Sequence, residues 1–147
     1  MDLFGNKPFR ALSWKQPFAT AMLAGKQETR VWDTAYRGSV LICSSKAPYD
    51  EAAVRNISGD DLFVKLCLAI QNHDSLVDMN GFAIAVGELV GSRPMRKCDE
   101  DSTFVLYRPE LFVHQYSNVR PIKPFPWKGS QGWKALNQTE ISQIVYI

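Results

Sequence analysis

The chain has 147 residues, of which 46% are hydrophobic and 22% are charged, and its formal net charge at pH 7 is +2. This composition predicts one soluble globular domain that buries a core without disulfide or metal cross-links. The small net charge excludes a strongly basic histone-like protein and an acidic disordered tail. The charge is uneven, however, because residues 1–46 carry +4, residues 47–103 carry −5 and residues 104–147 carry +3. If the two basic ends meet in the fold, they form one basic face.

Cysteine and histidine usage argues against a cofactor. The three cysteines, Cys43, Cys67 and Cys98, form no Cys-x-x-Cys pair, and only two histidines are present, so we expect neither a disulfide framework nor a metal site. No apolar run approaches the roughly 20 residues of a membrane span. The segment Met1–Arg10 lacks the apolar centre of a signal peptide. We therefore expect a cytoplasmic protein without a membrane partner, with a lead-in over residues 1–8 and a single domain over residues 9–147.

The first half of the chain predicts strands around one short helix. Phe9–Trp14 is expected to be a strand, and Pro17–Gly25 a helix of about two turns, with proline near its first position and glycine at its end. Glu28–Asp33 is expected to be extended. Gly38–Ser44 predicts a strand that is covered on both faces, because its central residues form an unbroken apolar run.

Two helices and a loop follow before the next strand. Pro48–Ile57 and Asp60–Gln71 predict helices, the second with an apolar stripe and an aspartate at its start. His73–Gly81 is expected to be a loop. Phe82–Val90 predicts a strand of small and branched apolar residues.

The last third of the chain predicts further short strands. Ser92–Ser102 is expected to be a polar surface excursion and Leu111–Val119 a strand. Ile122–Pro126 contains two prolines and is expected to be irregular or at a sheet edge. Gly132–Leu136 and Ile141–Tyr146 are candidate final strands. The fold class predicted is α+β, with about six strands in a curved sheet or barrel.

The richest functional pattern lies just after the first predicted helix. In an extended chain Lys26, Glu28, Arg30 and Trp32 share one face, because alternate side chains point the same way. Such a strip suits nucleic acid: the cations hold phosphate, the carboxylate accepts from an exocyclic amine, and the indole stacks on a base. The alternative is a solvated strand face with weak ion pairs.

Two other patterns have a functional and a structural interpretation. The dipeptides Trp14-Lys15, Trp127-Lys128 and Trp133-Lys134 place aromatic rings beside cations, as single-stranded nucleic acid requires, but their tryptophans are equally suited to a core. Ser44-Ser45-Lys46 is either an anion or nucleobase site, including an activated serine, or a turn that ends a strand. Cys43 is expected to be buried, and His114 to be structural.

Several ordered motifs resemble the ASCH (activating signal cointegrator homology) family. The resemblance covers most of the chain from Phe9 to Leu136. The segments that carry it are Ala11-Leu-Ser-Trp-Lys-Gln-Pro-Phe-Ala19, Glu28-Thr-Arg-Val-Trp32, Tyr36-Arg-Gly38, Val40-Leu-Ile-Cys-Ser-Ser-Lys46, Ala83 to Val90 with Ser92-Arg-Pro-Met95, Val119-Arg-Pro-Ile-Lys-Pro-Phe-Pro-Trp-Lys-Gly129 and Gly132-Trp-Lys-Ala-Leu136.

The resemblance implies a PUA-like β-barrel with a helix after the first strand and two inserted helices. It also implies an RNA-associated module whose cleft holds Lys26, Glu28 and Arg30, the matches to the family's GxKxxExR pattern. The segment here is about two residues shorter than that pattern. Some members with a similar barrel are amidohydrolases that use a lysine and a threonine, and Glu28 occupies the threonine position, with Thr29 adjacent.

Another ASCH protein type has been ascribed ribonuclease activity that relies on tyrosine, lysine and serine. Tyr36, Lys46 and Ser44 or Ser45 provide those residue types in this chain.

The function expected from the sequence is binding of single-stranded RNA or a modified nucleoside. Lys26, Glu28 and Arg30 form the polar floor of the site, which Ser44 and Ser45 complete. The stacking candidates are Trp14, Trp32 and Tyr36, and the phosphate contacts are Arg37, Lys46 and Lys128. One alternative is a hydrolase that acts on an acylated nucleoside or on RNA through Lys26 and Glu28. Another is an adaptor that binds a protein partner.

Overall fold

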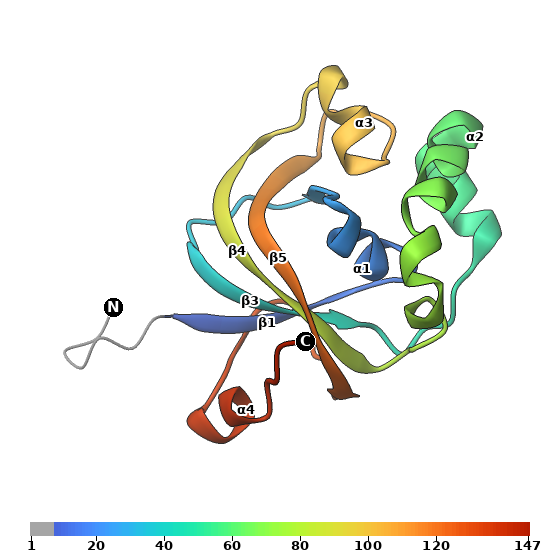
Figure 1. Ribbon diagram of the computed structural model, residues 1–147. Coiled ribbons are helices and arrows are strands. Elements are labelled where there is room, and N and C mark those ends of the chain that lie inside the picture. Colours follow the sequence, from blue (N-terminus) through green and yellow to red (C-terminus); the bar gives the residue numbers. More distant parts are fainter. Residues whose placement is uncertain (1–7) are drawn as a thin grey trace.

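The computed structural model describes residues 8–147, so the predicted lead-in lies outside the described residues except for Pro8. The fold is α+β, and its centre is a mixed six-stranded sheet curled into a half-barrel (Figure 1). The strand order is β2-β5-β4-β3-β1-β6. The strands are β1 (Phe9–Trp14), β2 (Glu28–Arg30), β3 (Gly38–Ser44), β4 (Phe82–Pro94), β5 (Phe112–Pro126) and β6 (Lys134–Ala135).

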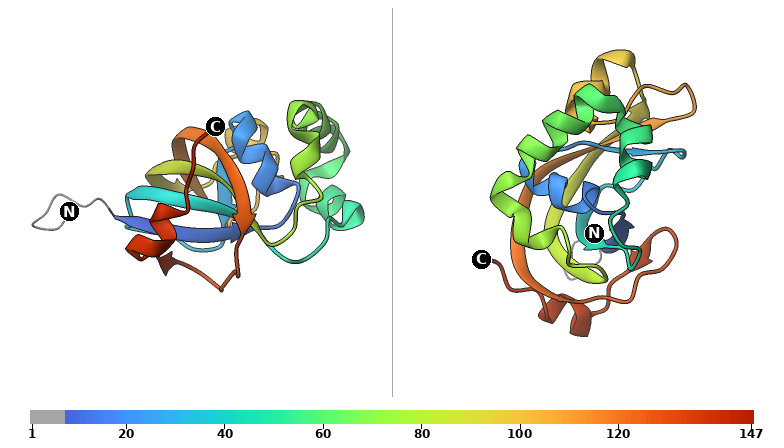
Figure 2. Two further views of the ribbon diagram at one scale, coloured as in Figure 1. Left: turned by 60° about the horizontal axis from the view of Figure 1, so that its bottom comes forward. Right: turned by 90° about the vertical axis from the view of Figure 1, so that its right-hand side faces the viewer.

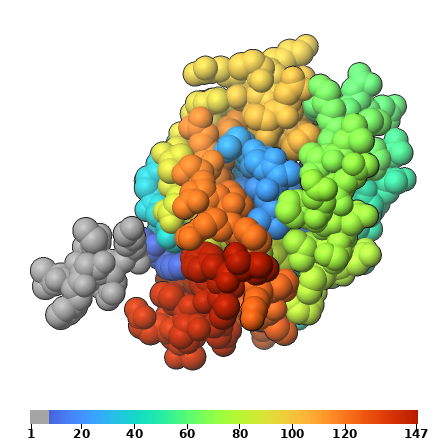
Figure 3. Space-filling view, viewed as in Figure 1, coloured from blue at the N-terminus to red at the C-terminus, as the bar shows by residue number. Residues whose placement is uncertain are grey.

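The helices are short except for one. They are α1 (Phe18–Ala21), η1 (Met22–Ala24), α2 (Glu51–Ala69), η2 (Gln71–Leu76), η3 (Lys97–Asp99), α3 (Glu100–Thr103) and α4 (Gln138–Ser142). Helix α1 lies between the curled sheet and α2 (Figure 1 and the left view of Figure 2). The chain around α1 and η1 reaches the surface between β5 and α2 (Figure 3). None of the helices in residues 8–147 combines the length and apolarity that a membrane crossing requires.

Both faces of the sheet are covered. Val40 and Ile42 belong to the main core, together with residues of α1 and three residues of α2, whereas Leu41 and Cys43 belong to a second core on the opposite face. The unbroken apolar run of β3 is explained by this arrangement, because each successive side chain enters a different core. The prediction of a strand covered on both faces, with Cys43 buried, is confirmed.

The two long strands differ from the prediction. β4 continues to Pro94, so the expected surface excursion begins as strand and then forms η3 and α3. β5 continues through the proline-rich segment to Pro126. The prolines are accommodated because this part of β5 is irregular: its register against β4 shifts between Ala83 and Ala85. β2 does not reach it, and its outer edge meets only the short segment 145–147, where the Lys123 N–H donates to the Val145 carbonyl at 2.8 Å. Both the irregular and the edge interpretation of that segment therefore hold in part.

Smaller differences concern helices. The predicted break between two helices is a kink at Gly59 inside α2, where φ is 72°. The expected loop after α2 contains η2. Of the two candidate final strands, Gly132–Leu136 contains β6, whereas Ile141–Tyr146 begins in α4 and forms only an isolated bridge from Tyr146 to Ile122. The polar start of α4 explains the helix, because Asn137 and Glu140 form a capping box there.

The two basic ends of the chain meet, because β6 pairs with β1 through Arg10↔Ala135 and Ala11↔Lys134. Some of the cationic side chains in these two ends already contact other residues. The Lys134 ammonium contacts Glu140 at 2.6 Å, and the Arg10 guanidinium lies 4.4 Å from the ring centre of Tyr36. The expected basic face is thus reduced at this junction.

Candidate functional site

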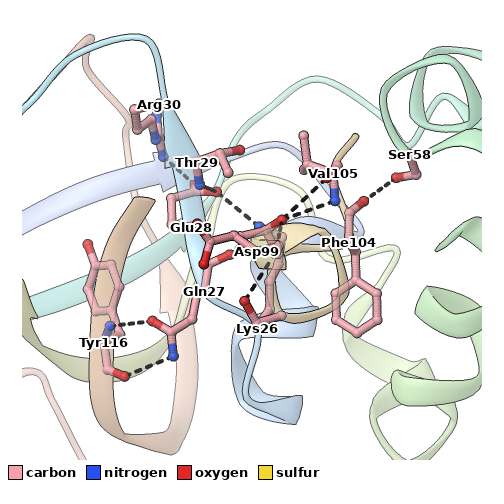
Figure 4. A network of polar contacts seen from close by, with 12 residues as sticks. Lys26, Gln27, Glu28, Thr29, Arg30, Ser58, Asp99, Phe104, Val105 and Tyr116 are labelled. Atoms are coloured by element: carbon pink, nitrogen blue, oxygen red, sulfur yellow. Dashed lines mark hydrogen bonds and ion pairs between the residues drawn. The ribbon is translucent and has the colours of Figure 1, made fainter. Parts of the chain in front are cut away.

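Strand β2 is a short, firmly held segment. The side chain of Gln27 continues the sheet, because its amide donates to the Tyr116 carbonyl at 3.2 Å and accepts from the Tyr116 N–H at 2.6 Å (Figure 4). The Gln27 N–H donates to the Ser102 carbonyl at 2.8 Å, which ties β2 to α3. Residues on either side of Gln27 therefore keep a fixed orientation.

Three charged side chains form a cluster on β2 and the residues before it. One Glu28 oxygen, Oε1, accepts from Lys26 Nζ at 3.2 Å and from the Thr29 N–H at 2.9 Å. The other, Oε2, contacts Arg30 Nη2 at 2.9 Å. Lys26 also donates to the Gln27 carbonyl at 2.8 Å. The alternation in the sequence thus produces a buried cation–anion–cation cluster, not a solvated face.

Burial and the neighbouring charges shift the pKa values of Lys26 and Glu28 in opposite directions. Burial lowers the pKa of Lys26 from its usual value, and the neighbouring Glu28 only partly offsets this effect. Burial raises the pKa of Glu28, but Lys26, Arg30 and the Thr29 amide outweigh it, so the pKa of this carboxyl lies below its ordinary value. Glu28 is therefore a well-satisfied carboxylate at neutral pH.

Arg30 is the accessible member of the cluster. Its side chain is 22% exposed, compared with 0% for Lys26 and 8% for Glu28. Its Nη2 also donates to the Ser13 carbonyl at 2.9 Å, and its guanidinium lies 5.1 Å from the ring centre of Trp14. Nε is buried and has no partner among residues 8–147. A ligand can reach only the exposed part of the anchored guanidinium.

A pocket of about 430 Å³ lies over this cluster, and we call it the β2 pocket. Its volume is within the range of roughly 300–1,000 Å³ that is typical of small-molecule sites. Its lining combines apolar walls with polar side chains from four separate segments of the chain. The lining residues are Leu12, Ser13, Trp14, Lys15, Phe18, Lys26, Glu28, Thr29, Arg30, Ser45, Ile57, Val105, Ser130, Gln131 and Gly132.

The structure brings some of the predicted site residues to the β2 pocket. Lys26, Glu28 and Arg30 line it, and so do Trp14 and Ser45. Trp14 is 2% exposed and belongs to the main core, so its ring forms a wall and offers no free stacking face. The Ser45 hydroxyl is buried and has no partner among the described residues.

Other predicted aromatic residues pack within the protein and are absent from the pocket lining. Trp32 packs edge-on against His114 and Trp133, with ring centres 4.8 and 5.9 Å apart. Tyr36 is buried and donates from its hydroxyl to the Ser39 carbonyl at 2.7 Å. The pKa of Tyr36 is raised to about 12, chiefly because of burial. The core interpretation of the Trp-Lys dipeptides holds for Trp14 and for Trp127, which is in the second core.

The remaining predicted polar contacts lie away from the pocket. Ser44 is buried and bonds the backbone of Met79 and Phe82, which is the structural role of a strand end. Arg37 donates to two nearby backbone carbonyls. Lys46 and Lys128 are exposed and do not line the pocket.

Sequence reasoning missed part of the pocket. Phe18, Ile57 and Val105 supply apolar walls, and the exposed segment 130–132 forms a rim. Phe18 and Gly132 lie in segments that carry the family resemblance, but no pattern marked any of these residues as part of a site, because they come from separate elements that only the tertiary fold assembles. Lys15 is an exception, since the Trp14-Lys15 dipeptide had marked it.

His114 is fully buried beneath β2, opposite Glu28 in the β2–β5 pairing. Its Nε2 bonds the Trp32 carbonyl at 2.9 Å, whereas its Nδ1 has no partner among residues 8–147. Burial lowers the pKa of His114 from its usual 6.5, and the Trp32 carbonyl opposes this. His114 is therefore neutral in the folded protein at pH 7, as expected of a structural residue.

Because of this histidine, we expect the free energy of unfolding to decrease in acid. Because its folded pKa lies below its unfolded pKa, the unfolded chain takes up the proton first, and the free energy of unfolding falls as the pH drops below about 6.5. Urea unfolding at pH 7.5, 6.5 and 5.5 measures this. His114→Gln is expected to flatten the decline over that interval, and an unchanged pH dependence in this variant would contradict the assignment.

Comparison with known proteins found no matching family model, and no curated protein matches the sequence significantly. Among residues 8–147, no group of three or more His, Cys, Asp or Glu side chains is arranged to hold a metal ion.

Proposed function

We propose that this chain is a nucleic-acid-binding domain of the ASCH type, with a PUA-like fold, that holds one unpaired nucleotide of RNA or a modified nucleoside in the β2 pocket. The motif order supports the family, and the curled six-stranded sheet with a helix after β1 agrees with it. The observation that carries the function is the buried Lys26–Glu28–Arg30 cluster beneath a pocket of nucleoside size.

The chemistry of the pocket favours a planar, acceptor-bearing ligand. Phe18 provides aromatic wall area, and Arg30 provides a planar donor that suits base edges and phosphate oxygens. Glu28 already accepts from three donors, so its main role is to fix the two cations. This differs from the expected contact between Glu28 and an exocyclic amine.

Binding is favoured over hydrolysis. A general base works best when its pKa lies near the working pH. The pKa of Glu28 is lowered and its oxygens are occupied, and Lys26 is held by Glu28 and the Gln27 carbonyl with no exposed surface. The protein-adaptor alternative does not use this pocket at all.

Isothermal titration tests the proposal with four probes: a single-stranded RNA octamer of mixed sequence, its duplex form, and the free nucleosides cytidine and N4-acetylcytidine. The single strand is expected to bind more tightly than the duplex, and its affinity is expected to fall as salt rises, because phosphates are neutralised. Absence of binding to every probe at low salt would refute the proposed function.

A further inference from the structure

A second pocket adjoins the first at the start of α2. It has a volume of about 710 Å³, and we call it the α2 pocket. It shares Lys15, Phe18 and Ile57 with the lining of the β2 pocket, so the two lie side by side. Its other walls come from the segment 47–54 and Gln16. A ligand larger than one nucleoside therefore has a continuous surface to follow.

Lys15 stands at the boundary between the two pockets. Its backbone carbonyl accepts from the N–H groups of Phe18 and Ala19, at 3.0 and 3.3 Å, which fixes its position at the start of α1. Its side chain is exposed and forms no ion pair with another described residue. A cation without an ion-pair partner among the described residues, placed between the β2 pocket and the α2 pocket, is well placed to bind the phosphate that links two nucleosides.

The walls of the α2 pocket suit a base and not a second phosphate. Tyr49 is half-buried and Pro48 lies next to it, which provides a surface for stacking. Asp50 and Glu51 also line this pocket. Asp50 Oδ1 accepts from the Ala53 N–H at 3.2 Å, and the Glu51 carboxylate lies 3.6 Å from the Arg55 Nε. These carboxylates repel phosphate and accept from the amino groups of bases.

We propose that the site binds a dinucleotide unit of single-stranded RNA, with one nucleoside in the β2 pocket, the linking phosphate at Lys15 and the neighbouring base against Tyr49. This inference rests on the proposed function and extends it from a nucleoside site to an oligonucleotide site. It makes Lys15 a phosphate contact and Tyr49 a stacking contact of the same groove.

Titration with cytidine, and with the dinucleoside monophosphates CpC, UpU, ApA and GpG, tests the inference. At least one dinucleoside monophosphate is expected to bind about tenfold or more tightly than cytidine, from one phosphate contact and one stacked base. Lys15→Gln is expected to remove most of this gain, which is measured as the ratio of dinucleotide to cytidine affinity within the same variant. It is also expected to abolish the salt slope of about 0.7 that one neutralised phosphate contributes.

Two pairs of variants, at Lys15 and Lys123 and at Tyr49, distinguish specific contacts from a general loss of positive charge or of stability. Lys123→Gln removes another exposed lysine, on β5 and outside both pockets, and is expected to change neither affinity. Tyr49→Ala is expected to reduce the dinucleotide gain, whereas Tyr49→Phe keeps it. If cytidine binds but no dinucleotide binds more tightly, the dinucleotide inference is wrong and the nucleoside site stands. If nothing binds, both are refuted.

Discussion

Glu28→Gln is expected to lower the free energy of unfolding by about 3–5 kcal/mol, the usual cost of removing one member of a buried ion pair. The loss is large because Lys26 has no exposed side-chain surface, and without Glu28 its charge and that of Arg30 face each other with no counter-ion. Total stabilities are typically about 5–15 kcal/mol, so the effect is readily seen by urea unfolding at pH 7.

Two further variants test the electrostatic cause. Glu110→Gln, in an exposed pair with Arg108, is expected to change the free energy of unfolding by less than about 1 kcal/mol. The double variant Lys26→Met with Glu28→Gln is expected to be more stable than Glu28→Gln alone, because it also removes the unpaired ammonium. A double variant that is less stable than the single would contradict the account of the cluster.

Arg30→Gln is expected to weaken binding of the single-stranded RNA octamer by about 10- to 100-fold, since hydrogen bonds to charged groups contribute roughly 1.5–3 kcal/mol. Arg30 is the one cluster member with substantial exposure, and Ser13 and Glu28 hold its guanidinium in place. Arg30→Lys is expected to recover only part of the affinity, because an ammonium lacks the planar fork.

Arg120→Gln is the matched control for that experiment. Arg120 is exposed on β5, and its guanidinium lies over the Tyr146 ring, outside both pockets. Its replacement is expected to change octamer affinity by less than twofold. Equal losses in the Arg30 and Arg120 variants would indicate nonspecific attraction to a positive surface and would contradict a defined site.

Local patterns predicted the elements whose side chains repeat regularly. β1 and β3 have the predicted bounds, and the alternation Lys26–Glu28–Arg30 correctly indicated that these side chains meet. The alternation did not reveal how deeply these side chains are buried. Whether a charged strip faces solvent or a covered pocket depends on α1, the Ile57 region of α2 and Val105, which lie far apart in the sequence.

The failures of prediction have a similar cause. Trp32 and Tyr36 looked like stacking platforms, but Trp133 from the end of the chain packs against both. The α2 pocket had no sequence signature, because its wall is a helix start that only tertiary packing places beside Lys15. Contacts between distant segments, which a local pattern does not record, decide which aromatic and charged residues remain available.

The most direct test of the central claim is an amide chemical-shift map of the ¹⁵N-labelled protein titrated with the single-stranded RNA octamer. Binding in the β2 pocket predicts that the largest shifts occur at Thr29, Arg30, Ser45 and residues 130–132, which line it from three separate segments. Shifts confined to α4 or to the exposed face of α2, with these residues unchanged, would contradict the account.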